Sequence, residues 1–363
     1  MESETIINIS ETETENILET PVAEDTEEVS QSREKEDDLA FENNRIPTIP
    51  QLCVALGILT VILGSPYLMR FLHLHNKDLP PAAVVRTPDR EENASVTSAT
   101  QFKGVTLEAE AAYVWDVSLQ RALFTKNAQA QLPLASLTKL MTALVTYEAH
   151  AAPEFTSITK EALNQEGNNG FHEGDTWNTK KLLDFTLMTS SNDGAYALAG
   201  SVGKAFADSA TDPEKAFVKQ MNAKSEEIGL SQTYFTNPTG LDASEAQSGS
   251  YGSARDMAFL MEYIVRNTPT LLEETRYTTA TFKDSAGLMY AATNTNQHIE
   301  SIDNPLGSKT GYTDLAGGNL VVALDVGLNH AVVISVLHST KEGRFSDVQK
   351  LIQKVREMYR KPS

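Results

Sequence analysis

The chain has 363 residues, and its 49 acidic and 30 basic side chains give a formal net charge of −19. This balance argues against a nucleic-acid-binding protein, because such proteins need a surplus of Lys and Arg to displace counterions from phosphates. Hydrophobic residues make up 40% of the chain, enough for a sizeable core, and the single cysteine, Cys53, excludes an intrachain disulfide framework and a Cys-cluster metal site.

The first 45 residues form a strongly acidic segment. Residues 1–45 contain 15 Asp or Glu against three basic residues, and Phe41 is the single aromatic among them. A segment of this composition buries too little apolar surface to offset the entropy lost on ordering, so it predicts a disordered tail. Residues 78–363 hold 34 acids and 25 bases, which is ordinary for a soluble domain.

An apolar segment follows the acidic tail. Residues 46–77 contain no acid, and residues 52–69 are eighteen consecutive residues without a charge. With the apolar residues on either side, this run reaches the roughly 20 residues that a bilayer core requires. A buried core helix or a cleaved signal peptide is an alternative, but the acidic leader is unlike a signal-peptide n-region. We therefore predict one transmembrane helix within 46–74 and a Pro-, Ser- and Thr-rich linker over 75–104.

The folded domain is expected over residues 105–363. It opens with two short strands joined by a turn, at 111–117 and 122–125. A helix then begins at Ser136, and it is apolar on most of its circumference, as a core helix is. Further helices are predicted at 180–189, 193–202, 213–228, 255–266 and 344–359, and an apolar hairpin at 319–326 and 330–338. Strands at both ends with helices between them indicate an antiparallel sheet covered by helices, plus a helical middle region.

A serine three residues before a lysine on one helix places both side chains on the same face, so the lysine amine can take the proton of the serine hydroxyl. The pattern occurs four times, beginning at Ser32, Ser136, Ser157 and Ser201. Only Ser136 opens a buried helix, where the N-terminal N–H groups favour a developing negative charge. Ser136 and Lys139 are therefore the candidate nucleophile and base.

Two further motifs follow in the chain. Residues 190–192 (SSN) are the only Ser-x-Asn, and residues 309–311 (KTG) are the only Lys-Thr-Gly. With Ser136 and Lys139 they stand in the order that is the signature of penicillin-binding proteins and serine β-lactamases. The segments LPLASLTKLMTALVTYE, LLDFTLMTSSNDGAYALA, YFTNPTGLDA and SKTGYTDLAGGNLV resemble the D-alanyl-D-alanine carboxypeptidase family of low-molecular-mass penicillin-binding proteins, peptidase family S11.

This resemblance runs over about 105–359 and implies a fold, a reaction and partners. The fold is the β-lactamase/transpeptidase-like α/β (α+β) fold, a five-stranded antiparallel sheet flanked by helices plus a helical subdomain. The implied substrate is a peptidoglycan stem peptide ending in D-Ala-D-Ala, and β-lactams are implied as covalent inhibitors. Neither a cofactor nor a metal is implied.

The resemblance also implies a role for each site residue. Ser136 would be the nucleophile that forms the acyl-enzyme, Lys139 its general base, and Ser190 the relay that protonates the departing D-alanine amine. A lysine normally holds its proton to about pH 10.4, so this base needs its pKa lowered by about three units, which burial and a second cation can supply. Among the implied substrate-binding residues, Asn192 would hold the substrate amide, and the terminal carboxylate would be bound by Lys309, Thr310 and Arg344. Gly311 would allow close approach of the substrate backbone. The backbone N–H of Tyr312 would join that of Ser136 in the oxyanion hole.

Other readings of the motifs involve different chemistry. A class A β-lactamase needs a glutamate between the second and third motifs to activate the deacylating water, and Glu161, the only Glu followed closely by Leu-Asn, lies before Ser190. A D,D-endopeptidase that cuts peptidoglycan crosslinks would use the same residues as a carboxypeptidase. A non-catalytic wall-binding module, whose acidic tail contacts a cytoplasmic partner, is disfavoured because all three motifs are intact.

The orientation of the predicted span follows from the substrate. Three basic residues lie on each side of the apolar run, so the positive-inside rule does not decide. Peptidoglycan lies outside the bacterial plasma membrane. The expected topology is therefore a cytoplasmic tail (1–45) and an extracytoplasmic catalytic domain (105–363), and the partner of the tail is not identified by its sequence.

Overall fold

The computed structural model describes residues 101–360. The predicted acidic tail (1–45), the predicted transmembrane helix (46–74) and most of the predicted linker (75–104) lie outside the described residues, so these three predictions stay predictions. Within residues 101–360, no helix has both the length and the apolar character needed to cross a bilayer.

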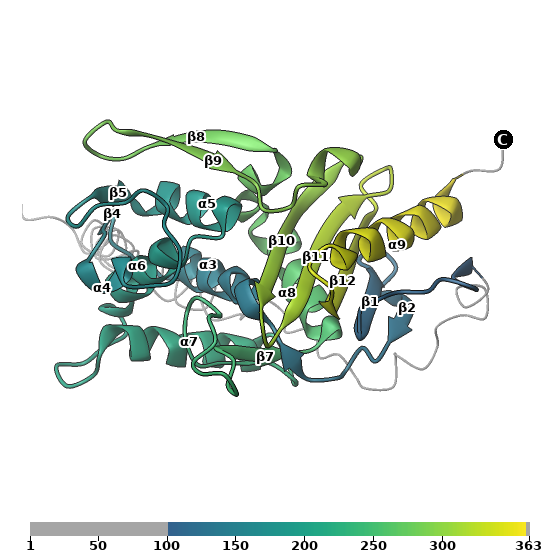
Figure 1. Ribbon diagram of the computed structural model, residues 1–363, viewed down its shortest axis with the longest axis horizontal. Helices are drawn as coiled ribbons and strands as arrows, with labels where there is room; N and C mark the ends of the chain where they lie inside the picture. The colour runs from purple at the N-terminus through teal and green to yellow at the C-terminus, as the bar shows by residue number, and fades with distance from the viewer. Residues whose placement is uncertain (1–100, 361–363) are drawn as a thin grey trace, which may run out of the picture. The chain divides into compact units, whose positions relative to one another are not determined.

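A five-stranded antiparallel sheet forms the centre of the described part, in the order β10-β11-β12-β1-β2 (Figure 1). Strands from both ends of the domain meet in it, because β1 pairs with β2 on one side and with β12 on the other. This confirms the predicted strands and the predicted terminal hairpin. The strands of this sheet are β1 (Ala111–Asp116), β2 (Arg121–Lys126), β10 (Pro305–Thr313), β11 (Gly317–Asp325) and β12 (Ala331–Ser339).

Helices cover both faces of the sheet (Figure 1). Helix α9 (Gly343–Tyr359) packs on β11 and β12, and α8 (Ala254–Asn267) packs on the opposite face. Successive strand residues point to opposite faces, so Val114 joins the core under α9 while Tyr113 and Trp115 join the core under α8. Because both faces are buried, the inner strands β1, β11 and β12 read as largely continuous apolar runs.

A helical region lies beside the edge strand β10 (Figure 1). Its helices are α3 (Thr138–Glu148), α4 (Lys160–Leu163), α5 (Thr179–Thr189), α6 (Asn192–Gly203) and α7 (Pro213–Glu227). The predicted helices α5, α6 and α7, together with α8 and α9, are confirmed to within one residue at each end, and the helix predicted to begin at Ser136 is confirmed as α3, which begins at Thr138. The sheet flanked by helices and the helical subdomain together confirm the expected fold class.

Short strands complete the described part, and the sequence pattern did not predict them. They are β3 (Leu132–Pro133), β6 (Tyr234–Phe235) and β7 (Ser250–Gly252) in one small sheet, β4 (Phe155–Ser157) with β5 (Thr176–Asn178), and β8 (Thr279–Lys283) with β9 (Met289–Thr293). The segment between β6 and β7 is a loop that packs against the start of α3, and it contributes directly to the site described below.

Candidate active site

Ser136 lies at the N-terminal end of the buried helix α3. It is in a 3-10 turn, Ala135–Leu137, that leads directly into α3, so the helix proper begins two residues later than the sequence pattern indicates. Ala135 adopts a φ of +48°, which turns the chain at this point. The half-buried Ser136 therefore faces the end of α3 where free N–H groups and the helix dipole favour negative charge.

Lys139 lies in the first turn of α3 and its side chain is fully buried. Its Nζ is 2.8 Å from Ser136 Oγ, 2.7 Å from Asn192 Oδ1 and 2.7 Å from the backbone oxygen of Thr239. Burial lowers the pKa of Lys139 from 10.5 to about 7, against the opposing effect of the Asp193 carboxylate. A base with a pKa near 7 is suited to proton transfer at neutral pH.

The Ser-x-Asn motif joins α5 to α6. Ser190 is the C-terminal cap of α5 and adopts a left-handed φ of 62°, and Asn192 is the first residue of α6. The Asn192 amide has two different neighbours, because Nδ2 donates to the backbone oxygen of Glu166 at 2.6 Å while Oδ1 accepts from Lys139. The Ser190 hydroxyl instead accepts a hydrogen bond from Lys309. The sharp turn thus places one motif residue against each lysine.

Lys309 lies on the edge strand β10 and is 1% exposed. Its Nζ donates to Ser190 Oγ at 2.8 Å and to the Thr310 backbone oxygen at 2.9 Å. Burial, followed by the charges of Lys139 and Arg344, holds the pKa of Lys309 well below its usual range. The two buried lysines, Lys139 and Lys309, are therefore close enough for the charge of one to act on the other.

The end of β10 is held closely against the turn that contains Ser136. A Cβ on Gly311 would lie 2.7 Å from the Leu134 oxygen and 3.2 Å from the Ser136 nitrogen, so this approach requires glycine. Arg344, at the start of α9, is buried and donates to the Gly311 oxygen at 2.8 Å, and burial lowers its pKa. Tyr312, by contrast, has an exposed side chain.

The structure brings all three predicted motifs into one hydrogen-bonded site. The other Ser-x-x-Lys segments are elsewhere: Ser157 is exposed on β4, Ser201 lies within α6, and Ser32 lies outside the described residues. Within the described residues, the segment that begins at Ser136 is the one whose lysine contacts Asn192 of the Ser-x-Asn motif.

Three contributors were missed by reasoning from sequence. The Thr239 carbonyl accepts from Lys139, the Asp193 carboxylate is buried near it, and Thr295 Oγ1 accepts from Thr310 Oγ1 at 2.6 Å. Desolvation raises the pKa of Asp193. Thr239 lies in the YFTNPTGLDA segment and Asp193 follows Ser-x-Asn directly, but a backbone carbonyl has no signature in residue type. No sequence signal marks Thr295.

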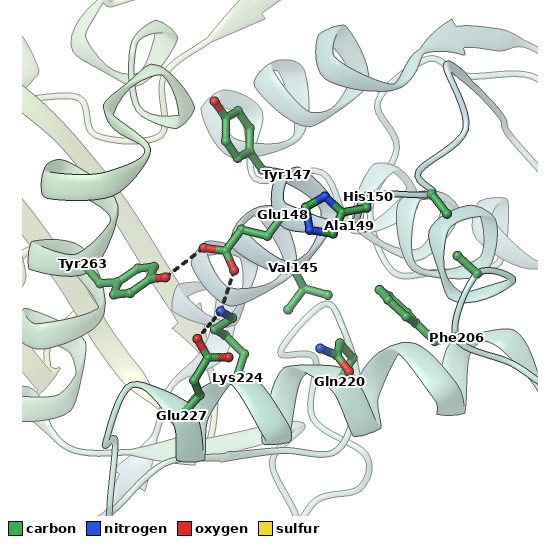
Figure 2. A pocket seen from close by; sticks show the side chains of 12 residues that line it. Val145, Tyr147, Glu148, Ala149, His150, Phe206, Gln220, Lys224, Glu227 and Tyr263 are labelled. Atoms are coloured by element: carbon green, nitrogen blue, oxygen red, sulfur yellow. Dashed lines mark hydrogen bonds and ion pairs between the residues drawn. The ribbon is translucent and has the colours of Figure 1, made fainter. Parts of the chain in front are cut away.

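A cavity of about 800 Å³ lies at the other end of α3 (Figure 2). There Lys224 pairs with Glu148 at 2.6 Å and with Glu227 at 2.8 Å, and the Tyr263 hydroxyl donates to Glu148 at 3.0 Å. None of the predicted site residues lines this cavity, since an 11-residue helix separates its two ends by about 15 Å. In the described part of the chain, no group of three or more His, Cys, Asp or Glu residues is placed to hold a metal ion.

Comparison with known proteins agrees with the geometry. The chain is similar to the D-alanyl-D-alanine carboxypeptidase DacF of Bacillus subtilis, with 30% identity over 68% of this chain and 61% of the relative. It is also similar to the D-alanyl-D-alanine endopeptidase of Escherichia coli, with 27% identity over 84% of this chain and 88% of the relative. The solved structure of ampicillin-bound penicillin-binding protein D2 from Listeria monocytogenes superposes with a TM-score of 0.56 at 28% identity, covering 69% of this chain and 98% of that one.

The coverage differs between these relatives. The chain spans about three fifths of the length of the carboxypeptidases from B. subtilis and E. coli, at 61% and 62%. The family match itself extends over residues 95–340 of the 363 and contains the Ser-x-x-Lys, Ser-x-Asn and Lys-Thr-Gly motifs. The chain therefore belongs to the D-alanyl-D-alanine carboxypeptidase family, peptidase family S11.

Proposed function

We propose that this protein is a serine D-Ala-D-Ala carboxypeptidase, which removes the terminal D-alanine from peptidoglycan stem peptides through an acyl-enzyme on Ser136. The observation that supports this most directly is the buried Lys139 amine, 2.8 Å from the Ser136 hydroxyl and with its pKa lowered to about 7. Membership of the carboxypeptidase family and the ampicillin-bound relative support the same reaction class.

Acylation begins with proton transfer from Ser136 to Lys139. The neutral lysine takes the hydroxyl proton as Oγ adds to the carbonyl carbon of the penultimate D-alanine. The backbone N–H groups of Ser136 and Tyr312 stabilise the negative charge that forms on the carbonyl oxygen. When the C–N bond breaks, Ser190 passes its hydroxyl proton to the departing nitrogen and takes in exchange the proton that Lys139 holds. D-alanine leaves as a neutral amine, Lys139 is neutral again, and an ester remains on Ser136. Water then hydrolyses the ester.

The terminal carboxylate is bound by the cations of the site. Lys309 and the Thr310 hydroxyl contact the carboxylate, and Arg344 adds positive charge behind Gly311. The pKa of Lys309 is lowered in the absence of an anion, so a bound carboxylate would favour its protonated form. Asn192 would hold the substrate amide through its Nδ2, which here donates to Glu166.

Covalent labelling with a fluorescent penicillin tests the proposal. We expect the full chain to be labelled, and Ser136→Ala and Lys139→Ala to abolish labelling. The matched control is Ser157→Ala, which removes the serine of another Ser-x-x-Lys segment at an exposed position, and it should be labelled like the unsubstituted chain. Undiminished labelling of the Ser136→Ala variant would overturn the assignment of the nucleophile.

A D,D-endopeptidase is the second candidate, because the chain covers 88% of the length of an endopeptidase from E. coli. Incubation with a pentapeptide ending in D-Ala-D-Ala, and in parallel with a crosslinked peptidoglycan dimer, separates the two activities. Release of D-alanine from the pentapeptide supports the carboxypeptidase. Cleavage of the dimer without D-alanine release supports the endopeptidase.

We further propose that residues 46–74 anchor the protein in the bacterial plasma membrane, with residues 1–45 in the cytoplasm and the catalytic domain outside. The uncharged run 52–69 and the extracytoplasmic location of peptidoglycan support this topology. Protease added to intact spheroplasts should degrade the catalytic domain and leave an epitope in the tail protected. Protection of the catalytic domain would overturn the orientation.

A further inference from the structure

The loop between β6 and β7 is organised by one side chain, that of Asn237. Its Oδ1 accepts hydrogen bonds from the Thr239 nitrogen at 3.2 Å, the Thr239 hydroxyl at 3.1 Å and the Gly240 nitrogen at 2.7 Å. Its Nδ2 donates to the Leu241 oxygen at 2.9 Å. One amide therefore determines the path of the three residues that follow Pro238.

This path presses the loop against the start of α3. The Pro238 oxygen accepts from Thr142 Oγ1 at 2.6 Å, and the Thr239 oxygen accepts from Lys139 Nζ at 2.7 Å. Gly240 has a φ of +80°, and a Cβ at this position would overlap the Ala135 carbonyl. The loop thus presents one backbone oxygen to Lys139 at a position that leaves little room for adjustment.

The partners of Lys139 decide how its neutral amine is oriented. A backbone oxygen and an amide oxygen only accept hydrogen bonds, whereas the Ser136 hydroxyl can donate as well. The assignment of the Asn192 oxygen is consistent, because its Nδ2 is engaged by the carbonyl of Glu166, which also only accepts. When Lys139 is neutral, its two N–H bonds point to Asn192 and Thr239. The lone pair then faces Ser136 Oγ.

We propose that Asn237 is a positioning residue for this reaction: by holding the Thr239 carbonyl against Lys139, it directs the amine lone pair at the Ser136 hydroxyl. The inference rests on the proposed function. In the step it serves, the Ser136 O–H bond breaks, an N–H bond forms on Lys139, and the freed oxygen electron pair forms the bond to the substrate carbonyl carbon. Asn237 itself touches neither the substrate nor the reacting atoms.

The test compares acylation of the full chain by a fluorescent penicillin with that of Asn237→Ala. The dependence of the rate on penicillin concentration separates the maximum acylation rate from the dissociation constant of the initial complex. We expect the maximum rate to fall at least tenfold with an unchanged dissociation constant, since the substrate-binding residues are untouched. Asn237→Asp keeps an oxygen for the Thr239 and Gly240 nitrogens and should recover most of the lost rate.

A matched control separates positioning from general loosening of the fold. Asn222 on α7 holds Phe235 in the same two-ended way, with both of its bonds to the Phe235 backbone at 2.8 Å. Its hydrogen bonds go to Phe235 and Val218 and not to the residues that hold the Thr239 carbonyl. Asn222→Ala should acylate at the rate of the unsubstituted chain. An equal loss in this control would overturn the proposal.

The remaining outcomes separate a failure of this inference from a failure of the proposed function. A folded Asn237→Ala variant with an unchanged maximum rate would overturn this inference and leave the proposed function intact. If the alanine variant does not fold, Asn237→Ser, which keeps one hydroxyl acceptor, takes its place with the same expected direction. Failure of the unsubstituted chain to be acylated at all would instead overturn the proposed function.

Discussion

The pH dependence of acylation follows from the environment of Lys139. Acylation needs the neutral amine, and desolvation lowers the pKa of Lys139 to about 7. The neutral fraction of a group with this pKa is about 10% at pH 6, about 50% at pH 7 and about 90% at pH 8. The acylation rate should therefore rise about tenfold between pH 6 and pH 8 and then level off. A lysine with an ordinary pKa near 10.4 would be about 0.4% neutral at pH 8, and the acylation rate would still be rising about tenfold per pH unit there.

Stopped-flow acylation by a fluorescent penicillin, measured from pH 5.5 to 9.5 in one ionic strength, gives this profile. Asp193→Asn removes a carboxylate that raises the pKa of Lys139, so the midpoint should move to lower pH. Lys160→Ala, which removes the exposed lysine of the Ser157 segment, should leave the midpoint unchanged. An acylation rate that keeps rising tenfold per pH unit beyond pH 8, or one that is independent of pH, would refute the role of Lys139 as a base with a lowered pKa.

Three further substitutions, the first with a control, test the packing of the site, the stability of the fold and the binding of the terminal carboxylate. Gly311→Ala places a methyl 2.7 Å from a carbonyl oxygen and should lower the acylation rate at least tenfold. The control is Gly200→Ala, whose new methyl has nothing within 4 Å, and it should leave the acylation rate unchanged. Urea unfolding should show that this control stabilises α6 by about 0.5–1 kcal/mol. Asp347→Ala removes a fully buried carboxylate that accepts hydrogen bonds from two backbone nitrogens and the Ser339 hydroxyl, so urea unfolding should show a loss of about 3 kcal/mol. Arg344→Gln should raise the KM for a peptide ending in D-Ala-D-Ala about tenfold, the value of one charge-assisted hydrogen bond, and an unchanged KM would exclude Arg344 from carboxylate binding.

Much of the fold was predictable because its signals are local. The helices from α5 to α9 were found to within one residue, since each shows apolar residues on one face over several turns. The terminal hairpin was found because β-branched runs flank a short turn. Strand β10 was missed as a strand, because its Gly-Ser-Lys-Thr-Gly sequence is poor in the residues that favour strands. Its pairing with β11 determines its conformation instead.

The candidate site also contains contacts that the sequence predicts and contacts that it does not predict. Ser136 and Lys139 are neighbours because three residues along the 3-10 turn and the start of α3 span about one turn, and the spacing in the sequence predicts this closeness. The order of the three motifs was enough to identify the family. Lys309 and Ser190, however, are 119 positions apart, and Lys139 and Thr239 are 100 apart.

Those long-range contacts depend on how the sheet, the helices and the β6–β7 loop pack. The amino-acid sequence establishes that two serines, two lysines and an asparagine of this family are present and in order. The lowered pKa of Lys139 and the direction of its lone pair are properties of the tertiary structure. Both arise from burial and from backbone oxygens, and neither of these is a property of residue type.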